Sequence, residues 1–382
     1  MLIQKTPYHS WKTGSLIKGC RECVQGKKMV LFITGLCDRH CFYCPVADTK
    51  NQKDVLFANE WDTGFDGRLT KRVKDIIIKE AELTEASGAG ITGGDPLKVT
   101  NRVCSIIRLL KKRFGKQFHI HLYTPLQYVT KSTLKKLHLA GLDEIRFHPF
   151  VWGDKELYKI GWANKFSWKV GVEIPAIPGY EEKMKALMRN LKGKITFMNL
   201  NELEISDTNA QGLVKRHYVT KDNISYGVKG SEELAKRLLK FSVDKKLHYS
   251  VHYCTCKLKD AVQMAQRLKR RAKNAAMPFD EITDEGMLIR GVIYPEETKP
   301  DFGYRKKLKA IPTAKKKALL KKLTPLTKQF SNAFLDEEKI RLIVPLDELK
   351  QKSASLKKQG FTTAKVEEYP TYDGFEVEIE FL

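Results

Sequence analysis

Three cysteines in one short loop are the residues of this 382-residue chain whose types and spacing point most directly to chemistry. Cys37, Cys41 and Cys44 follow a Cys-x3-Cys-x2-Cys spacing. Thiolates this close in sequence can face one point, and soft sulfur ligands select iron–sulfur clusters or zinc. A cubane cluster held by three cysteines leaves one iron free for a substrate or cofactor. The loop is therefore the candidate catalytic and metal-binding centre.

A structural zinc site is the main alternative for this loop. Structural zinc takes four closed ligands, whereas the loop offers three cysteines. His40 is a fourth donor, but its place inside the loop makes a tetrahedral arrangement awkward. The composition of the loop therefore favours a cluster over zinc.

The loop resembles the cysteine motif of the radical S-adenosylmethionine (SAM) superfamily, with an aromatic residue, Tyr43, just before the last cysteine. An apolar run at residues 29–34, predicted as a buried strand, directly precedes the loop, as in that family. The resemblance implies that SAM chelates the free iron through its amino and carboxylate groups. It also implies that an electron from a [4Fe-4S] cluster cleaves SAM to methionine and a 5′-deoxyadenosyl radical, which abstracts hydrogen from a substrate.

A second motif, Gly93-Gly94-Asp95, lies at the end of the next predicted strand. The resembled family carries Gly-Gly-Glu at this point, where it binds the methionyl amino group of SAM. Asp95 keeps the carboxylate but shortens its reach, so the backbone of the two glycines is expected to carry more of the contact. The resemblance thus makes these three residues and Tyr43 candidate cofactor contacts.

Strands and helices alternate through the middle of the chain. Strands are predicted at residues 118–124, 144–150, 169–174 and 195–205, with helical stretches between them. Such alternation indicates right-handed βαβ units and a parallel sheet. About six units, counted from residue 29, match the partial (β/α)6 barrel of the resembled family, which is an α/β fold of TIM type.

Ligands in such barrels bind at the carboxyl ends of the strands, and this rule selects further candidate SAM and substrate contacts. They are Thr124, Arg146, His148, Glu173 and the cluster of Asn201, Glu202 and Glu204. Arg146 and His148 lie two residues apart and share one face of their strand, although a structural ion pair is the alternative for Arg146. Glu202 and Glu204 also share a face, and two carboxylates on a parallel barrel strand favour a binding role.

Two cysteine pairs outside the loop predict a second metal site. Cys20 and Cys23 precede the first strand, and Cys254 and Cys256 follow the last barrel element. Together they supply four sulfurs, the number for an all-cysteine zinc site or an auxiliary iron–sulfur cluster. The sequence does not choose between these two metals. Cys104, on the apolar face of a helix, is expected to be a small buried hydrophobe.

Four segments are predicted along the chain. They are an N-terminal extension with a cysteine pair (1–27), a radical SAM partial barrel (28–256), a basic helix and linker (257–286) and a small C-terminal α+β domain (287–382). The chain contains no run of eighteen apolar residues, so no membrane span is expected. Its first residues lack the apolar core of a signal peptide, and cysteines grouped as metal ligands favour the reducing cytoplasm.

A formal net charge of +24 indicates anionic partners. Residues 305–328 contain ten Lys or Arg and no acid. Clustered cations fit phosphate-rich molecules, with RNA, and tRNA in particular, as the first candidate. Lys-rich surfaces also mark some thermophile proteins, and charge runs are often solvated helix faces. Neither an RNP element nor a KH-type loop is present to decide the matter.

Three functions remain open. The first is a radical SAM enzyme that modifies RNA or tRNA, and the second is one that activates a protein or acts on a small metabolite. The third is a non-catalytic, metal-stabilised nucleic-acid-binding protein, which the intact cysteine loop and Gly93-Gly94-Asp95 argue against. Through Lys18-Gly19-Cys20 and residues 37–45, the chain resembles an archaeal-type group related to the pyruvate formate-lyase activating enzyme. That resemblance implies an electron donor of ferredoxin or flavodoxin type.

Overall fold

The computed structural model describes residues 2–382, which form two compact units divided between Arg267 and Leu268. Each unit has its own sheet and its own hydrophobic core. The division between the units falls inside helix α9 (Ala265–Ala275). The finer division into four segments stays a prediction.

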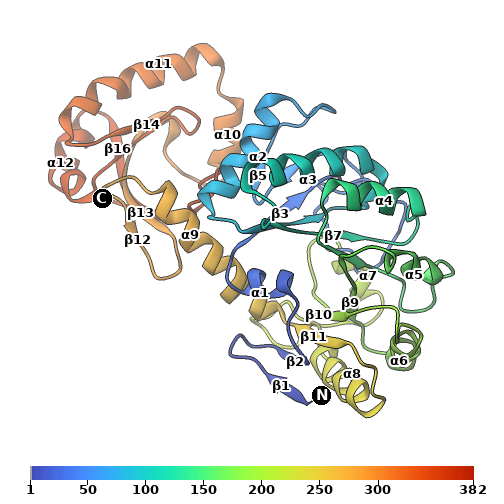
Figure 1. The fold of residues 1–382 in the computed structure, drawn as a ribbon. Coiled ribbons are helices and arrows are strands. Elements are labelled where there is room, and N and C mark those ends of the chain that lie inside the picture. Colours follow the sequence, from blue (N-terminus) through green and yellow to red (C-terminus); the bar gives the residue numbers. More distant parts are fainter. Residues whose placement is uncertain (1) are drawn as a thin grey trace. The chain divides into compact units, whose positions relative to one another are not determined.

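Seven parallel strands form the centre of the first unit (Figure 1). In the order in which they lie side by side, they are β3 (Lys28–Phe32), β6 (Gly88–Thr92), β7 (His119–Thr124), β8 (Glu144–Phe147), β9 (Lys169–Ala176), β10 (Phe197–Glu202) and β11 (Ser250–Cys254). The predicted α/β fold with a partial barrel is confirmed, and β11 adds a strand to the six that were counted. The strand order is open, so the barrel is partial.

Short antiparallel strands continue the sheet beyond both ends of the parallel set. On the β11 side lie β2 (Trp11–Thr13) and then β1 (Ile3–Lys5). On the β3 side lie β4 (Phe57–Ala58) and then β5 (Trp61–Asp62). Both ends of the parallel set are therefore paired.

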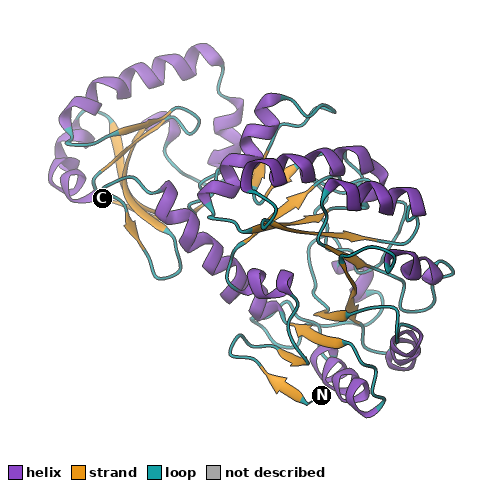
Figure 2. Ribbon diagram, viewed as in Figure 1, coloured by secondary structure: helices purple, strands orange, loops and turns teal. Residues whose placement is uncertain are grey.

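Helices connect the parallel strands and cover the outer side of the sheet (Figure 2). They are α2 (Lys71–Leu83), α3 (Thr100–Phe114), α4 (Lys131–Ala140), α5 (Ile160–Ala163), α6 (Glu181–Asn190), α7 (Ala210–Val214) and α8 (Ser231–Asp244), with short 3-10 turns η1 (Pro96–Val99) and η2 (Leu157–Lys159). In α3, Val103, Ile106, Ile107 and Leu110 recur at helical spacing and are all fully buried. Thr130 caps the start of α4 with a reciprocal hydrogen-bond pair.

Helix α1 (Lys18–Val24) packs against strands β3, β6 and β7. Its approach is close: a Cβ atom on Gly19 would lie 2.5 Å from Nη2 of Arg146 and 3.0 Å from the Glu144 carboxylate. A larger residue here would displace these two charged side chains. After β11, a π-helical turn η3 (Leu258–Met264) leads into α9.

The second unit is an antiparallel sheet with helices packed on it, an α+β arrangement. Its strands lie in the order β14 (Phe334–Asp336), β15 (Arg341–Val344), β13 (Leu288–Pro295), β16 (Phe361–Glu368) and β17 (Glu376–Phe381), and β12 (Glu281–Ile282) pairs with β13. The remaining elements are η4 (Glu296–Thr298), α10 (Tyr304–Ala310), α11 (Thr313–Leu323), η5 (Thr324–Gln329) and α12 (Leu346–Lys358). Its core joins Leu319 and Leu323 of α11 and Leu349 of α12 to Leu342 of β15.

Among residues 2–382, no helix combines the length and the apolar composition that crossing a bilayer requires.

Candidate functional site

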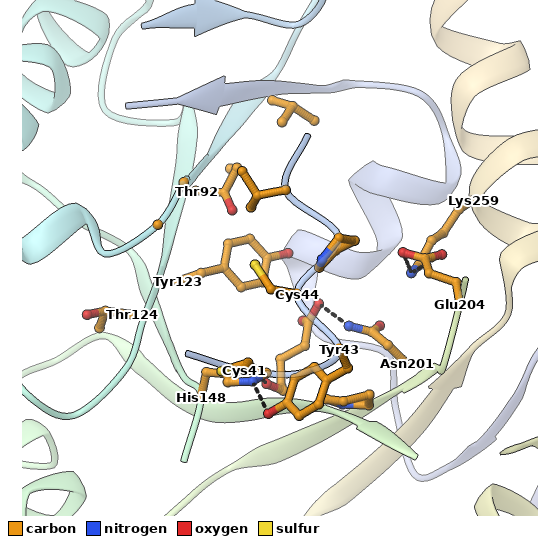
Figure 3. A pocket seen from close by; sticks show the side chains of 18 of the residues that line it. Cys41, Tyr43, Cys44, Thr92, Tyr123, Thr124, His148, Asn201, Glu204 and Lys259 are labelled. Carbon is orange, nitrogen blue, oxygen red and sulfur yellow. Dashed lines mark hydrogen bonds and ion pairs between the residues drawn. The ribbon is translucent and has the colours of Figure 1, made fainter. Parts of the chain in front are cut away.

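A cavity of about 580 Å³ lies where β6, β7, β9 and β10 end. It is lined by residues from the ends of these strands and from the cysteine loop, among them Thr92, Thr124, Pro175 and Asn201 (Figure 3). Its position is the one that parallel βα units dictate, because the loops that follow the strands converge there. The cavity is therefore the candidate active site.

Cys37, Cys41 and Cys44 all line this cavity, as half-buried free thiols. The loop turns between them, since the Cys44 amide donates to the Cys41 carbonyl (3.0 Å). The Arg39 amide also donates to Sγ of Cys37 (3.4 Å). Figure 3 shows Cys41 and Cys44 among the side chains of this wall, and Cys41 interacts with the hydroxyl of Tyr43. The three predicted ligands thus share one chamber.

Burial disfavours loss of the proton from two thiols of this loop. It raises the pKa of Cys41 to about 11 and also raises the pKa of Cys37. Metal and cluster ligands are thiolates, so ligation must displace these protons.

The two glycines of the second motif allow the end of β6 to contact the cysteine loop. A Cβ atom on Gly93 (φ 147°) would collide with the Thr34 carbonyl, and one on Gly94 would lie 2.5 Å from the Leu36 carbonyl. The Gly94 amide donates to the Thr34 carbonyl (2.8 Å), so this donor is already used. Both glycines line the cavity, and their carbonyl groups remain as acceptors for a cofactor.

Asp95 lies behind the glycines and is 1% exposed. Its Oδ1 accepts hydrogen bonds from the Thr124 hydroxyl (2.8 Å) and the Leu97 amide (3.0 Å). Oδ2 is buried and has no hydrogen-bond partner, and burial raises the pKa of this carboxyl to about 6. Asp95 is absent from the cavity wall, so its predicted contact with SAM stays a prediction.

A chain of hydrogen bonds fixes the protonation of His148. Nδ1 lies 2.7 Å from the Glu173 carbonyl, which only accepts, so Nδ1 carries the proton. Nε2 is then the acceptor for the Tyr43 hydroxyl at 3.0 Å. Burial lowers the pKa of His148, which keeps the ring neutral. The aromatic residue of the cysteine loop is thereby anchored to the end of β8.

Glu173 connects three neighbouring strands. Its carboxylate accepts from Arg146 (2.8 Å), from Asn199 (2.7 Å) and from Asn201 (3.1 Å). Glu173 lines the cavity, whereas Arg146 is 2% exposed and pairs with Glu144 below it. The structural ion pair that was the alternative for Arg146 is therefore present, and a cofactor contact for it stays a prediction.

Glu202 and Glu204 both line the cavity but have different partners. Glu202 is 1% exposed, pairs with Lys221 (2.7 Å) and accepts from the Cys256 amide (2.8 Å). Glu204 pairs with Lys259 at 3.3 Å. Both carboxylates are therefore charge-balanced, and Glu204 is the more accessible of the two.

Three further lining residues, Lys28, His121 and Tyr123, escaped the sequence analysis. His121 and Tyr123 alternate with His119 along β7. The ring centroids of His121 and Tyr123 lie 5.1 Å apart. Polar residues at every second position of a buried parallel strand were the signal that identifies them. Lys28, at the start of β3, offered no comparable pattern.

The two further cysteine pairs lie in α1 and at the end of β11. Cys20 accepts a hydrogen bond from Asn199 (3.3 Å), Cys23 lines the cavity and Cys256 faces Glu204 (3.6 Å). Burial raises the pKa of Cys254, and the nearby Cys20 and Cys23 add to that effect. Across residues 2–382, no group of three or more His, Cys, Asp or Glu side chains is placed to hold a single metal ion. A second metal on these cysteines stays a prediction.

A family model and a similar protein show the family of this chain. The model of the Radical SAM superfamily matches residues 31–191. A protein of Methanocaldococcus jannaschii, provisionally named a glycyl-radical enzyme activating enzyme, is 44% identical over 287 residues, which cover 73% of each chain. Among solved structures, methylornithine synthase matches at 13% identity and a TM-score of 0.39, over 62% of this chain and 74% of its own. Coproporphyrinogen III oxidase from Escherichia coli matches at 10% identity and a TM-score of 0.31, over 91% of this chain and 94% of its own.

The cavity fits the cofactors of that family. A cubane cluster binds each cysteine through a different iron, so its ligands stand farther apart than the ligands of a single ion. Three thiols in one chamber and the backbone of Gly93 and Gly94 in its wall match the donor chemistry that a cluster and SAM require. The chain is therefore an enzyme of the radical SAM superfamily, whose members carry a [4Fe-4S] cluster and SAM, and it is related to the activating enzyme of pyruvate formate-lyase.

Proposed function

We propose that Cys37, Cys41 and Cys44 hold a [4Fe-4S] cluster and that SAM occupies the cavity beside it. When bound, the cluster supplies the electron that splits SAM into methionine and a 5′-deoxyadenosyl radical. The observation that carries this assignment is that all three thiols of one loop open into a chamber built from strand ends.

In this assignment the protein positions SAM with its own polar groups. Gly93 and Gly94 present carbonyl oxygens to the amino group, and Thr124 and neutral His148 line the wall beyond them. Glu202 and Glu204 are the acceptors for hydroxyl groups. Partly enclosed walls limit the side reactions that are open to a radical formed there.

We further infer that the hydrogen atom is taken from a glycine residue of a partner protein. The relative that is 44% identical carries the name of a glycyl-radical enzyme activating enzyme. The transfer breaks the Cα–H bond of that glycine and forms 5′-deoxyadenosine, leaving the unpaired electron on the partner. The electron that starts each cycle comes from an external donor of ferredoxin or flavodoxin type.

The test is anaerobic reconstitution with iron and sulfide, followed by dithionite and SAM, with 5′-deoxyadenosine as the readout. We expect the product from the native chain and its loss in Cys41→Ala. Cys104→Ala is the matched control, because Cys104 is a buried thiol on α3 outside the cavity. Product formation that survives in Cys41→Ala contradicts the assignment.

RNA is the second candidate substrate, on one specific observation. Ten Lys or Arg occur in residues 305–328 without an acid, and six of these lysines are exposed with no acidic partner in the described chain, among them Lys306, Lys315 and Lys317. The second unit as a whole is less basic, with 23 Lys and Arg against 18 Asp and Glu. Its binding of tRNA should weaken steeply with salt, and each lysine removed should reduce the slope by about 0.7 to 0.9. An unchanged slope after Lys315→Gln and Lys317→Gln contradicts this candidate.

We also propose a second metal centre on Cys20, Cys23, Cys254 and Cys256, in a chain that works in the reducing cytoplasm. All eight cysteines are free thiols, which fits such a compartment. Iron and zinc analysis of Cys20→Ala tests the centre: loss of metal beyond that held by the three-cysteine loop supports it, and unchanged metal content refutes it.

A further inference from the structure

Five aromatic side chains form a continuous stack around the cysteine loop, which we call the aromatic platform. Its members are Phe42, Phe150, Trp152, Tyr180 and Tyr218. Phe42 stacks on Trp152 (ring centroids 5.9 Å apart) and on Tyr218 (6.3 Å). Trp152 also stacks on Phe150 at 4.7 Å and contacts Tyr180 at 5.9 Å. The platform is partly open to solvent, with Trp152 37% exposed.

The platform lies outside the cavity. None of its five rings belongs to the cavity wall, although Phe42 stands in the chain between Cys41 and Cys44. A molecule resting on the platform therefore lies against the backbone of the cysteine loop without entering the chamber. This arrangement suits a partner that delivers an electron to the loop, and it does not suit a substrate that must reach the chamber.

Positively charged side chains lie beside the platform. The Arg216 guanidinium lies 4.5 Å from the centroid of Phe42 and is exposed, with no acidic partner in the described chain. Arg39 stacks on Phe150 at 4.1 Å, although its own charge is paired with Asp154 (2.7 Å). The whole first unit is basic, with 46 Lys and Arg against 27 Asp and Glu. Aromatic and arginine side chains dominate the energetic centres of protein interfaces, and this charge complements an acidic partner.

We propose that the aromatic platform and Arg216 form the docking surface for a small acidic electron-carrier protein that reduces the cluster. The proposal rests on the proposed function, because it assigns the entry point for the electron on which SAM cleavage depends. The carrier is oxidised by one electron, and the enzyme's oxidised cluster accepts that electron. Five rings and one arginine form a small patch, in keeping with the small interfaces of electron-transfer pairs.

The test compares Arg216→Glu with Lys192→Glu in the reconstituted enzyme. Lys192 is exposed and follows α6 on the way to the start of β10, at the opposite end of the strands from the cysteine loop, and its substitution changes the net charge equally. The probe is a small acidic ferredoxin, labelled for fluorescence anisotropy. We expect Arg216→Glu to raise the Kd of the ferredoxin about tenfold at low salt, and to flatten its salt dependence, while Lys192→Glu stays within about twofold.

The second readout is the rate at which reduced ferredoxin bleaches the cluster absorbance, with dithionite as the chemical reductant in parallel. Arg216→Glu and Trp152→Phe should slow reduction by ferredoxin while reduction by dithionite is unchanged. Equal ferredoxin binding and reduction by the native chain and Arg216→Glu overturns the docking proposal. Loss of 5′-deoxyadenosine from the native chain with dithionite would instead overturn the proposed function, since that arm contains no carrier protein.

Discussion

At the scale of single residues, the site depends on the space that each side chain occupies as much as on the groups that it binds. The spacing of Cys37, Cys41 and Cys44 was readable from the sequence because ligand type and separation follow directly from cluster chemistry. The reason for a glycine at position 94 could not be predicted from the sequence. It depends on the Leu36 carbonyl, which lies next to Gly94 only after β6 and the cysteine loop have packed together. The same is true of Asp95, whose hydrogen-bond partner Thr124 comes from the next strand.

Gly94→Ala should prevent normal loading of the cluster. The added methyl group would lie 2.5 Å from the Leu36 carbonyl, so the cysteine loop must shift away from β6. We expect iron content after reconstitution to fall clearly below that of the native chain, because three thiols on a shifted loop no longer converge on one cluster. Gly161→Ala is the matched control, because no atom lies within 4 Å of its Cβ position. Full iron content in Gly94→Ala would refute the role given to this glycine.

Asp95→Asn should stabilise the cluster-free protein at neutral pH. The native pKa of Asp95 is about 6, above the value of 3.8 expected for the unfolded chain. Between these values the folded state binds more protons, so this group makes stability fall as pH rises from about 4 to 6. Asparagine keeps the Oδ1 acceptor but does not titrate, so the decrease in stability with rising pH disappears. The expected increase in the free energy of unfolding is up to about 3 kcal/mol above pH 6. Urea unfolding at pH 4 and 7 measures it, and exposed Asp75→Asn should change neither value.

At the scale of elements, the alternation of strand and helix was predictable because buried parallel strands have a distinctive length and composition. The count stopped at six because β11 follows a long connection that holds α7 and α8. Pairings between distant parts of the chain, such as β2 with β11, leave no local pattern. What couples neighbouring strands near the cavity is Glu173, through its contacts with β8 and β10.

Glu173→Gln should loosen this part of the sheet. The substitution keeps the shape of the side chain but leaves the buried Arg146 guanidinium with one carboxylate fewer, and breaking a buried ion pair costs about 3 kcal/mol. The expected result is a loss of that order in the free energy of unfolding, measured with urea. Glu182→Gln supplies the comparison, since its side chain is 78% exposed and its pairing with Lys185 contributes little. Similar losses in both variants would show that Glu173 does not connect the strands.

At the scale of the whole molecule, the chain holds two sheets with separate cores, and its positive charge is concentrated in the first unit. The sequence predicted a small α+β domain at the C-terminal end and also assigned the main positive charge to that domain. A run of lysines is conspicuous in a sequence, whereas the acidic residues of the same unit are distributed along its strands, helices and loops.

Two separate cores predict two thermal transitions. Leu342→Ala removes a fully buried side chain from the core of the second unit, and Ile91→Ala does the same in the first. Each should cost about 2–5 kcal/mol, and each should shift one calorimetric transition while the other stays in place. A single transition that moves equally in both variants would show that the two cores unfold together.

The short strand β2 has a practical consequence for handling the protein. It pairs with β11, which otherwise would end the parallel set with a row of unpaired backbone groups. Bare strand edges recruit strands from other molecules, which is the first step of aggregation. Removing residues 2–13 should therefore yield a protein that precipitates or assembles into oligomers, even though every cavity residue is retained. Purification tags belong at the other end of the chain.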